Sequence, residues 1–265
     1  YKTFGTLEIN TGVAPVPVSN TRKVHLSFVV DVSGSMGGTG IRRGKLSYVK
    51  STLKHMINYM KQFVVENPQS EVKITIITFS HGANLVSDTV FNVDTPRSVY
   101  DVTLSLINSL KASGATNLCQ AICLNNTCLD SSSEYDSYSI IMTDGYTNRG
   151  EFTAKERLLS LLNTNSPYIF IGYGTEHDSH MLRHLSTGKY NEYHIIENDQ
   201  NAGMVYGEIV SNTMFEAYKN IVLTGENVEY YDALHDTWSS QLAIDSLSYD
   251  SEKTYHMRTV SDDLG

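Results

Sequence analysis

Three short polar motifs supply oxygen-bearing side chains that suit a metal ion. They are Asp31-Val-Ser33-Gly-Ser35, the isolated Thr116, and Asp144 with the glycine that follows it. In the first motif the side chains alternate, so positions i, i+2 and i+4 of a chain leaving a strand can face one locus. The intervening glycine allows a sharp backbone turn. Because donor sets made only of oxygen suit hard cations such as Mg²⁺, these five side chains indicate a divalent-cation site.

The donor types also bear on what such a site would do. Asp31 and Asp144 are its only carboxylates, and the other three groups are neutral hydroxyls. If the hydroxyls bind directly and the carboxylates hold bound waters, the site keeps most of the positive charge of the cation. It then favours an anionic ligand from outside. Two-metal hydrolytic centres need several carboxylates and a base, so the donor set favours cation-mediated binding over hydrolysis.

Strands and helices alternate through most of the chain and must position these motifs. Valine-rich apolar runs predict core strands, and apolar residues at steps of three and four predict amphipathic helices. The predicted strands are residues 24–30, 72–79, 138–143, 168–173 and 193–196, with a short edge hairpin at 85–93. The predicted helices are residues 45–65, 99–110, 118–128, 152–162, 181–185 and 205–218. This order predicts an α/β fold with a doubly wound, mostly parallel, Rossmann-like sheet flanked by helices.

The two ends of the chain have a different pattern of apolar and polar residues. After residue 221, apolar and polar residues alternate without helical periodicity, which predicts β structure. Residues 1–21 read as an extended lead-in with one strand. We therefore expect an α/β domain over residues 22–220, and a small accessory β unit built from residues 1–21 and 221–265.

The three motifs occur together in the order typical of one family. Each lies at the end of a predicted strand or in a loop before a helix, and open parallel sheets bind ligands at the carboxyl ends of their strands. Asp31-Val-Ser-Gly-Ser-Met, Thr116 and Thr143-Asp-Gly resemble the metal-ion-dependent adhesion site of von Willebrand factor A (VWA) domains. The resemblance covers residues 22–220. It implies a non-catalytic module for divalent-cation-dependent protein–protein recognition.

The resemblance also implies a role for each donor. Ser33 and Ser35 would bind Mg²⁺, or Mn²⁺ or Ca²⁺ in its place, through their hydroxyls. Thr116 would bind directly or through water, and Asp31 and Asp144 mainly through water. A Glu or Asp side chain of a partner protein would complete the octahedron. The β extension is not part of the minimal VWA module.

Composition narrows the function classes. The 265 residues are 40% hydrophobic and 18% charged, which is typical of a folded globular chain. The net charge of −9 argues against a nucleic-acid partner, since that affinity depends on Lys and Arg neutralising phosphates. No apolar run approaches 18 residues, so the sequence predicts no membrane span. It indicates neither the compartment nor the oligomeric state.

Three patterns that would indicate an enzyme are incomplete in this sequence, and each is therefore less well supported than the divalent-cation site. Thr39 and Leu46 break the pattern of a phosphate-binding loop around Gly44-Lys45. The serine motif lacks the first glycine of a Gly-x-Ser-x-Gly elbow. His177, His180 and His184 cluster, but Met181 stands where a zinc protease needs Glu.

We therefore expect no enzyme activity. The main alternative left open is a metal-independent scaffold that uses helix faces or the β extension. A metal- or nucleotide-dependent enzyme is less favoured. The three cysteines, Cys119, Cys123 and Cys128, are expected to be reduced thiols in the core.

Overall fold

The computed structural model divides the chain into two compact units. One comprises residues 19–206, here called the α/β unit, and the other combines residues 1–18 with 207–265, here called the β unit. The residues that the structure describes are 3–12, 22–38, 44–144, 147–151, 153–175, 177–188, 191–197, 199–214, 216–233, 236–249 and 251–260.

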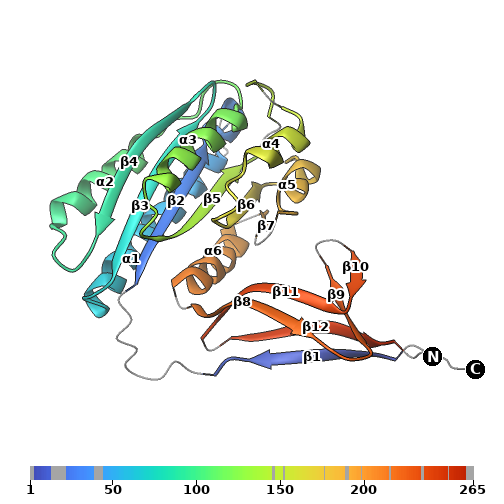
Figure 1. Cartoon of the computed structure of the whole chain (residues 1–265). Coiled ribbons are helices and arrows are strands. Elements are labelled where there is room, and N and C mark those ends of the chain that lie inside the picture. The colour runs from blue at the N-terminus through green and yellow to red at the C-terminus, as the bar shows by residue number, and fades with distance from the viewer. Residues whose placement is uncertain are drawn as a thin grey trace, which may run out of the picture. The chain divides into compact units, whose positions relative to one another are not determined.

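The α/β unit is built on a six-stranded sheet with the order β4-β3-β2-β5-β6-β7 (Figure 1). The strands are β2 (Lys23–Asp31), β3 (Glu71–Phe79), β4 (Ala83–Phe91), β5 (Asp136–Thr143), β6 (Tyr168–Tyr173) and β7 (Glu192–Ile196). Neighbouring strands are parallel, except that β4 runs antiparallel to β3. Every residue of β2 after Lys23 is buried, as expected for a central strand covered on both faces.

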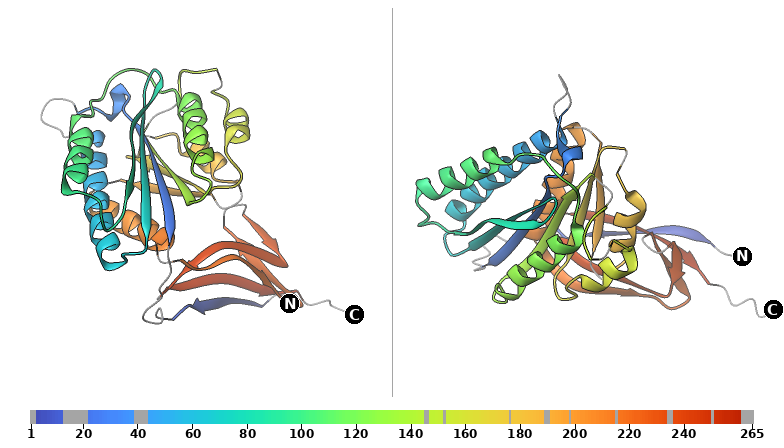
Figure 2. Two further views of the ribbon diagram at one scale, coloured as in Figure 1. Left: turned by 60° about the vertical axis from the view of Figure 1, so that its left-hand side comes forward. Right: turned by 90° about the horizontal axis from the view of Figure 1, so that it is seen from above.

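Helices cover both faces of this sheet. They are α1 (Lys45–Glu66), α2 (Arg97–Ser109), α3 (Leu118–Asp130), α4 (Lys155–Leu161), α5 (Ser179–Leu185) and α6 (Asp199–Met214). Figure 2 shows α1 and α2 on one face and α3, α4 and α5 on the other. The doubly wound α/β fold expected from the sequence is confirmed. Among the described helices, none combines the length and apolarity needed to cross a membrane.

The winding direction changes at β2. From there the chain adds β3 and β4 on one side, and later β5, β6 and β7 on the other. Asp31 is the last residue of β2, and Asp144 directly follows β5. The register of these adjacent strands pairs Val30 with Met142, so both aspartates leave the sheet at one edge. This switch point is where open α/β sheets bind ligands.

The β unit contains two small sheets. Its strands are β1 (Phe4–Asn10), β8 (Glu216–Thr224), β9 (Val228–Asp232), β10 (Thr237–Ser239), β11 (Gln241–Ser248) and β12 (Glu252–Thr259). The four-stranded sheet has the order β1-β12-β9-β10, and β11 pairs with β8. Because β1 pairs antiparallel with β12 along its whole length, the expected pairing of the two chain ends is confirmed.

The edge hairpin predicted at residues 85–93 is wrong. Residues 83–91 form one continuous strand, β4, paired with β3. Ser87 and Asp88 interrupt the apolar pattern, which suggested a break there. Both are satisfied within the sheet, since Ser87 hydrogen-bonds to Thr89 and Asp88 pairs with Lys73 on β3. Cross-strand partners therefore hold polar residues in a strand that the sequence pattern divides.

The helix predicted over residues 205–218 is displaced. Helix α6 spans Asp199–Met214, and the chain is already in strand β8 from Glu216. Pairing with β11, which sets Ile221 opposite Ile244, overrides the local helical pattern. The domain boundary expected at residue 220 therefore falls inside β8, whereas the two units divide at residue 207 within α6.

Candidate functional site

Four of the five predicted donor residues form one hydrogen-bonded cluster at the switch point. The backbone N–H of Ser33 donates to Asp31 Oδ1 at 2.7 Å. The hydroxyls of Ser33 and Ser35 are 3.1 Å apart, and Ser35 Oγ donates to Asp144 Oδ1 at 2.9 Å. The structure therefore brings together two carboxylates and two hydroxyls from the ends of two strands.

The hydrogen bonds orient the hydroxyl proton of Ser35. That single proton goes to Asp144, so Ser35 Oγ accepts in its contact with Ser33 Oγ, and the Ser33 hydroxyl faces both Ser35 Oγ and the Asp31 carboxylate. Thr143, the last residue of β5, donates to Asp31 Oδ2 at 2.6 Å. Each hydroxyl proton thus points toward a carboxylate or along this chain, which leaves lone pairs on both serine oxygens for an electrophile.

The exposure of the side chains increases across the cluster, from the protein interior to the surface. Asp31 is fully buried, and Ser33 and Asp144 are nearly so, whereas Ser35 is exposed. Burial raises the pKa of the Asp31 carboxyl, and the hydrogen bonds from Thr143 and Ser33 oppose that rise. Both oxygens of Asp31 accept from neutral groups. The cluster therefore concentrates acceptor oxygens beneath one exposed hydroxyl.

Thr116 lies in the neighbouring loop, just before α3. The loop is fixed to the turn after β2, because Gly34 N donates to Gly114 O at 3.0 Å and Ser113 N donates to Val32 O at 2.7 Å. Thr116 is 4% exposed. Within the described part of the chain, its side chain makes no hydrogen bond to the other four predicted donors. Backbone hydrogen bonds of Ser113 and Gly114 thus hold the loop that carries Thr116 beside the turn after β2.

Asn117 connects the loops around Thr116. It caps α3 by accepting a hydrogen bond from Gln120 N at 3.1 Å, and its Nδ2 donates to His81 O at 3.1 Å. Gly150 lies so close that a Cβ there would come within 2.4 Å of Asn117 Oδ1. Three loops at the carboxyl edge of the sheet therefore meet at one side chain.

Sequence analysis missed one charged member of the site. Lys45, the first residue of α1, donates from Nζ to Asp144 Oδ2 at 2.5 Å. Sequence analysis considered Lys45 only as part of a phosphate-binding-loop pattern, and a lysine at the start of a predicted helix does not indicate a contact with Asp144. We call Asp31, Ser33, Ser35, Lys45 and Asp144 the rim cluster.

A search for other metal-ligand groups gives none in the described ranges. No group of three or more His, Cys, Asp or Glu side chains there is arranged to hold a metal ion. The rim cluster contains only two carboxylates, so it is not a group of that kind. His177 instead contacts Gly174 O and the hydroxyl of Tyr193. The three cysteines are free thiols, and Cys119 and Cys128 are buried, but the core position expected for Cys123 is wrong because its side chain is exposed.

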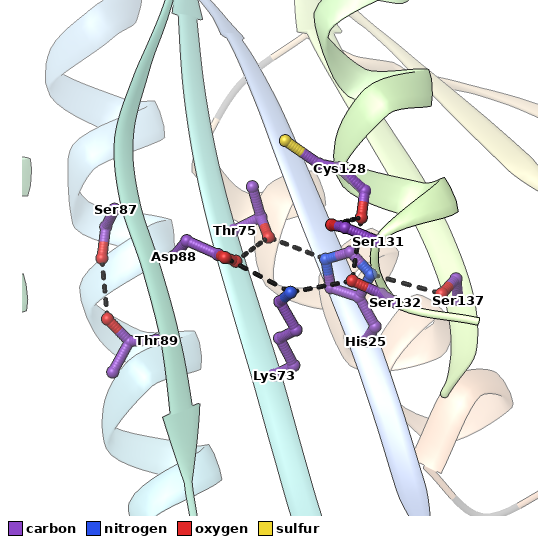
Figure 3. A network of polar contacts seen from close by, with 10 residues as sticks. All are labelled: His25, Lys73, Thr75, Ser87, Asp88, Thr89, Cys128, Ser131, Ser132 and Ser137. Atoms are coloured by element: carbon purple, nitrogen blue, oxygen red, sulfur yellow. Dashed lines mark hydrogen bonds and ion pairs between the residues drawn. The ribbon is translucent and has the colours of Figure 1, made fainter. Parts of the chain in front are cut away.

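A second polar cluster lies under α3, toward the amino ends of β2 and β3 (Figure 3). His25 Nε2 is 2.8 Å from Thr75 Oγ1, and Thr75 donates to Asp88 Oδ1 at 2.8 Å. Lys73 Nζ donates to Ser132 Oγ at 2.8 Å and is 3.3 Å from Asp88 Oδ2. We call these five residues, with Ser137 beside the other ring nitrogen of His25, the His25 cluster. Sequence analysis did not predict it.

Comparison with known proteins agrees with this fold. Residues 26–146 match the family model described as "von Willebrand factor type A domain". The chain also resembles a structure described as von Willebrand factor type A from Catenulispora acidiphila, with a TM-score of 0.64 at 14% identity, covering 98% of this chain and 66% of that one. The α/β unit has the VWA fold.

Two further relatives carry VWA-like regions within larger proteins. The human inter-alpha-trypsin inhibitor heavy chain H3 is 23% identical over 216 residues, which is 78% of this chain and 22% of that protein. The pilus adhesin SpaC from Lactobacillus rhamnosus GG has a TM-score of 0.58 at 12% identity, covering 100% of this chain and 42% of that one. This chain therefore spans about a fifth of the heavy chain it matches (22%).

Proposed function

We propose that the α/β unit is a non-catalytic, divalent-cation-dependent module for protein recognition. Ser33 and Ser35 would bind Mg²⁺ through their hydroxyls, with Thr116, Asp31 and Asp144 contributing directly or through water. A Glu or Asp side chain of a partner protein would complete the coordination. The observation that carries the proposal is the rim cluster itself, in which two hydroxyls and two carboxylates converge at the switch point.

The spacing of the two serine oxygens suits a small cation. Octahedral Mg²⁺ binds oxygen at roughly 2.0–2.1 Å, so two neighbouring donors lie about 3 Å apart. The serine hydroxyls are 3.1 Å apart. This spacing is therefore compatible with both serine hydroxyls binding one Mg²⁺ ion.

The charge of the rim cluster supports a cation with an external anionic ligand. The carboxylates of Asp31 and Asp144 carry two negative charges, and the ammonium of Lys45 offsets one of them. One net negative charge attracts a divalent cation without neutralising it. When bound, Mg²⁺ would supply a positively charged coordination position for a carboxylate. Ser35 is exposed, so a partner side chain can reach that position.

The experiment is a calorimetric titration of EDTA-treated protein with Mg²⁺ and with Mn²⁺. The test variant is Ser35→Ala, because Ser35 is exposed and its loss disturbs the fold little. The matched control is Ser160→Ala, an exposed helix serine whose hydroxyl donates to Arg157 O within its own helix. We expect one site, weakened at least about tenfold by Ser35→Ala and unchanged in the control. Absence of binding, or equal binding by both variants, would reject the proposal.

The second candidate is a metal-independent scaffold that docks through the β unit. An aromatic group on its four-stranded sheet favours it. Phe4 is 64% exposed and packs edge-on against Trp238, which also contacts Tyr231 and Arg258. Partner capture that persists in EDTA and is lost in Phe4→Ala would support this candidate. Capture that is lost in EDTA would favour the metal-dependent module.

A further inference from the structure

Lys45 holds an ammonium group against the proposed metal site. Its Nζ lies 2.5 Å from Asp144 Oδ2, while Ser35 Oγ donates to the other oxygen of the same carboxylate. The Asp144 side chain is 0% exposed, and that of Lys45 is 34% exposed. A buried carboxylate of the site is therefore already paired with a cation that belongs to the chain.

The backbone directs Lys45 to this position. Helix α1 begins at Lys45, after an extended Gly44, so its side chain leaves the first turn. The side chain runs past Gly174, where an added Cβ would lie 3.3 Å from Lys45 Cε and 3.5 Å from Nζ. Gly174 has a φ of 79°, which glycine adopts without strain. The loop after β6 thus leaves room for the lysine.

Local helix preferences do not explain a lysine here. The first turn of α1 reads Lys-Leu-Ser-Tyr, and a positive charge at a helix N-terminus is unfavourable because that end of the helix dipole is positive. The ion pair with Asp144 is the interaction that offsets this cost. Residues that break a local preference in this way concentrate at functional sites.

We propose that Lys45 sets the affinity of the rim cluster for divalent cations by competing for Asp144. The inference rests on the proposed function of the same site. With Lys45, the cluster has a net charge of −1, and without it the charge is −2. The ammonium therefore lowers the affinity for the cation alone. The carboxylate of an acidic partner restores the missing negative charge, so cation and partner bind with positive coupling.

The test compares Mg²⁺ titrations of the wild type, Lys45→Met, Lys45→Arg and Lys50→Met. Lys45→Met keeps the length of the side chain and removes its charge, and Lys45→Arg retains the charge. Lys50→Met removes a charge from the same helix at a lysine whose ammonium, among the described residues, hydrogen-bonds to Asn108 O. We expect Mg²⁺ to bind Lys45→Met at least about tenfold more tightly than wild type, with the other two variants within about twofold. Thermal unfolding in EDTA verifies that Lys45→Met folds.

The outcomes separate the two proposals. Mg²⁺ binding by the wild type with equal or weaker binding by Lys45→Met would overturn the role of Lys45 and leave the metal site standing. Mg²⁺ binding by the wild type that is tightened at least about tenfold in Lys45→Met, and abolished there by adding Ser35→Ala, would support both. Absence of binding in the wild type and in Lys45→Met would reject the metal site and the role of Lys45 with it.

Discussion

The rim cluster and the His25 cluster draw buried polar groups from opposite ends of the same central strands, β2 and β5, yet they balance charge differently. In the His25 cluster, Lys73 pairs with Asp88 and the uncharged His25 completes the network, so the charges sum to zero. In the rim cluster, two carboxylates face one ammonium. A buried polar network in which every group is paired stabilises the fold. A net charge left at an exposed edge of the sheet instead favours binding of a ligand of opposite charge.

The hydrogen bonds of the His25 cluster explain why its histidine stays neutral. The Thr75 hydroxyl donates its single proton to Asp88, so His25 Nε2 must donate to Thr75 Oγ1. The other ring nitrogen, Nδ1, faces the hydroxyl of Ser137. Burial lowers the pKa of His25 to about 4, and the nearby ammonium of Lys73 adds to that effect. The arrangement holds one tautomer and disfavours the charged ring.

The largest expected effect follows from this titration. Between pH 6.5 and 4 the unfolded chain protonates His25 while the folded chain does not, so stability falls as the pH falls through this range. At pH 4, this difference in protonation lowers the free energy of unfolding by about 3 kcal/mol relative to neutral pH. Urea unfolding at pH 7 and pH 4.5 measures it, with His25→Gln as the comparison. An unchanged pH dependence in His25→Gln would contradict a buried neutral histidine.

The second-largest effect on stability is expected when the charge balance of the His25 cluster is broken. Lys73→Met leaves the Asp88 carboxylate without its ammonium partner and should lower the free energy of unfolding by about 2 kcal/mol. The loss is smaller than for a fully buried ion pair, because the Asp88 side chain is 39% exposed. Urea unfolding at pH 7 gives the stability change. Mg²⁺ titration should give wild-type affinity, and a weakened affinity would show that the two clusters are not separate.

Loosening the loops around Thr116 should affect stability and cation binding together. Asn117→Ala removes the cap of α3 and the hydrogen bond to His81 O, which costs about 1–2 kcal/mol. Because these bonds hold the Thr116 loop against the rim, Mg²⁺ should bind a few-fold more weakly. Paired denaturation and calorimetry test this. Lower stability with unchanged Mg²⁺ affinity would remove Thr116 from the proposed donor set.

The smallest stability effect is expected for the exposed serine of the rim cluster. Ser35→Ala should change the free energy of unfolding by less than about 0.5 kcal/mol without Mg²⁺, since Ser35 is exposed and bonds only within the cluster. Saturating Mg²⁺ should raise the thermal midpoint of the wild type and not that of Ser35→Ala. A large loss of stability without Mg²⁺ would mean that Ser35 is structural.

The sequence predicts the fold well because the pattern of burial is local. The apolar stripe of α1 and the valine-rich run of β2 are read from neighbouring residues, and the structure buries both. The two errors, at β4 and at residues 216–218, occur where pairing with another strand overrides the local pattern. Propensity and periodicity do not carry that tertiary information.

In the candidate site, too, the residues of a local motif are predictable from the sequence, and the tertiary contacts are not. Asp31, Ser33 and Ser35 form a contiguous motif, so their convergence follows from a strand end and a turn. Lys45 meets Asp144 from 99 residues away, and nothing in its local sequence indicates that contact. His25 and Lys73 likewise look like ordinary polar interruptions of apolar strands. Their partners become visible only when the strands are side by side.

The central claim is that a divalent cation binds inside the rim cluster. Crystals of the protein soaked in Mn²⁺ and measured at the manganese absorption edge test it most directly. The account predicts an anomalous peak about 2.2 Å from Ser33 Oγ and Ser35 Oγ, with the Asp144 carboxylate beside it. A peak elsewhere in the molecule, or no peak above background at the rim cluster, would contradict it.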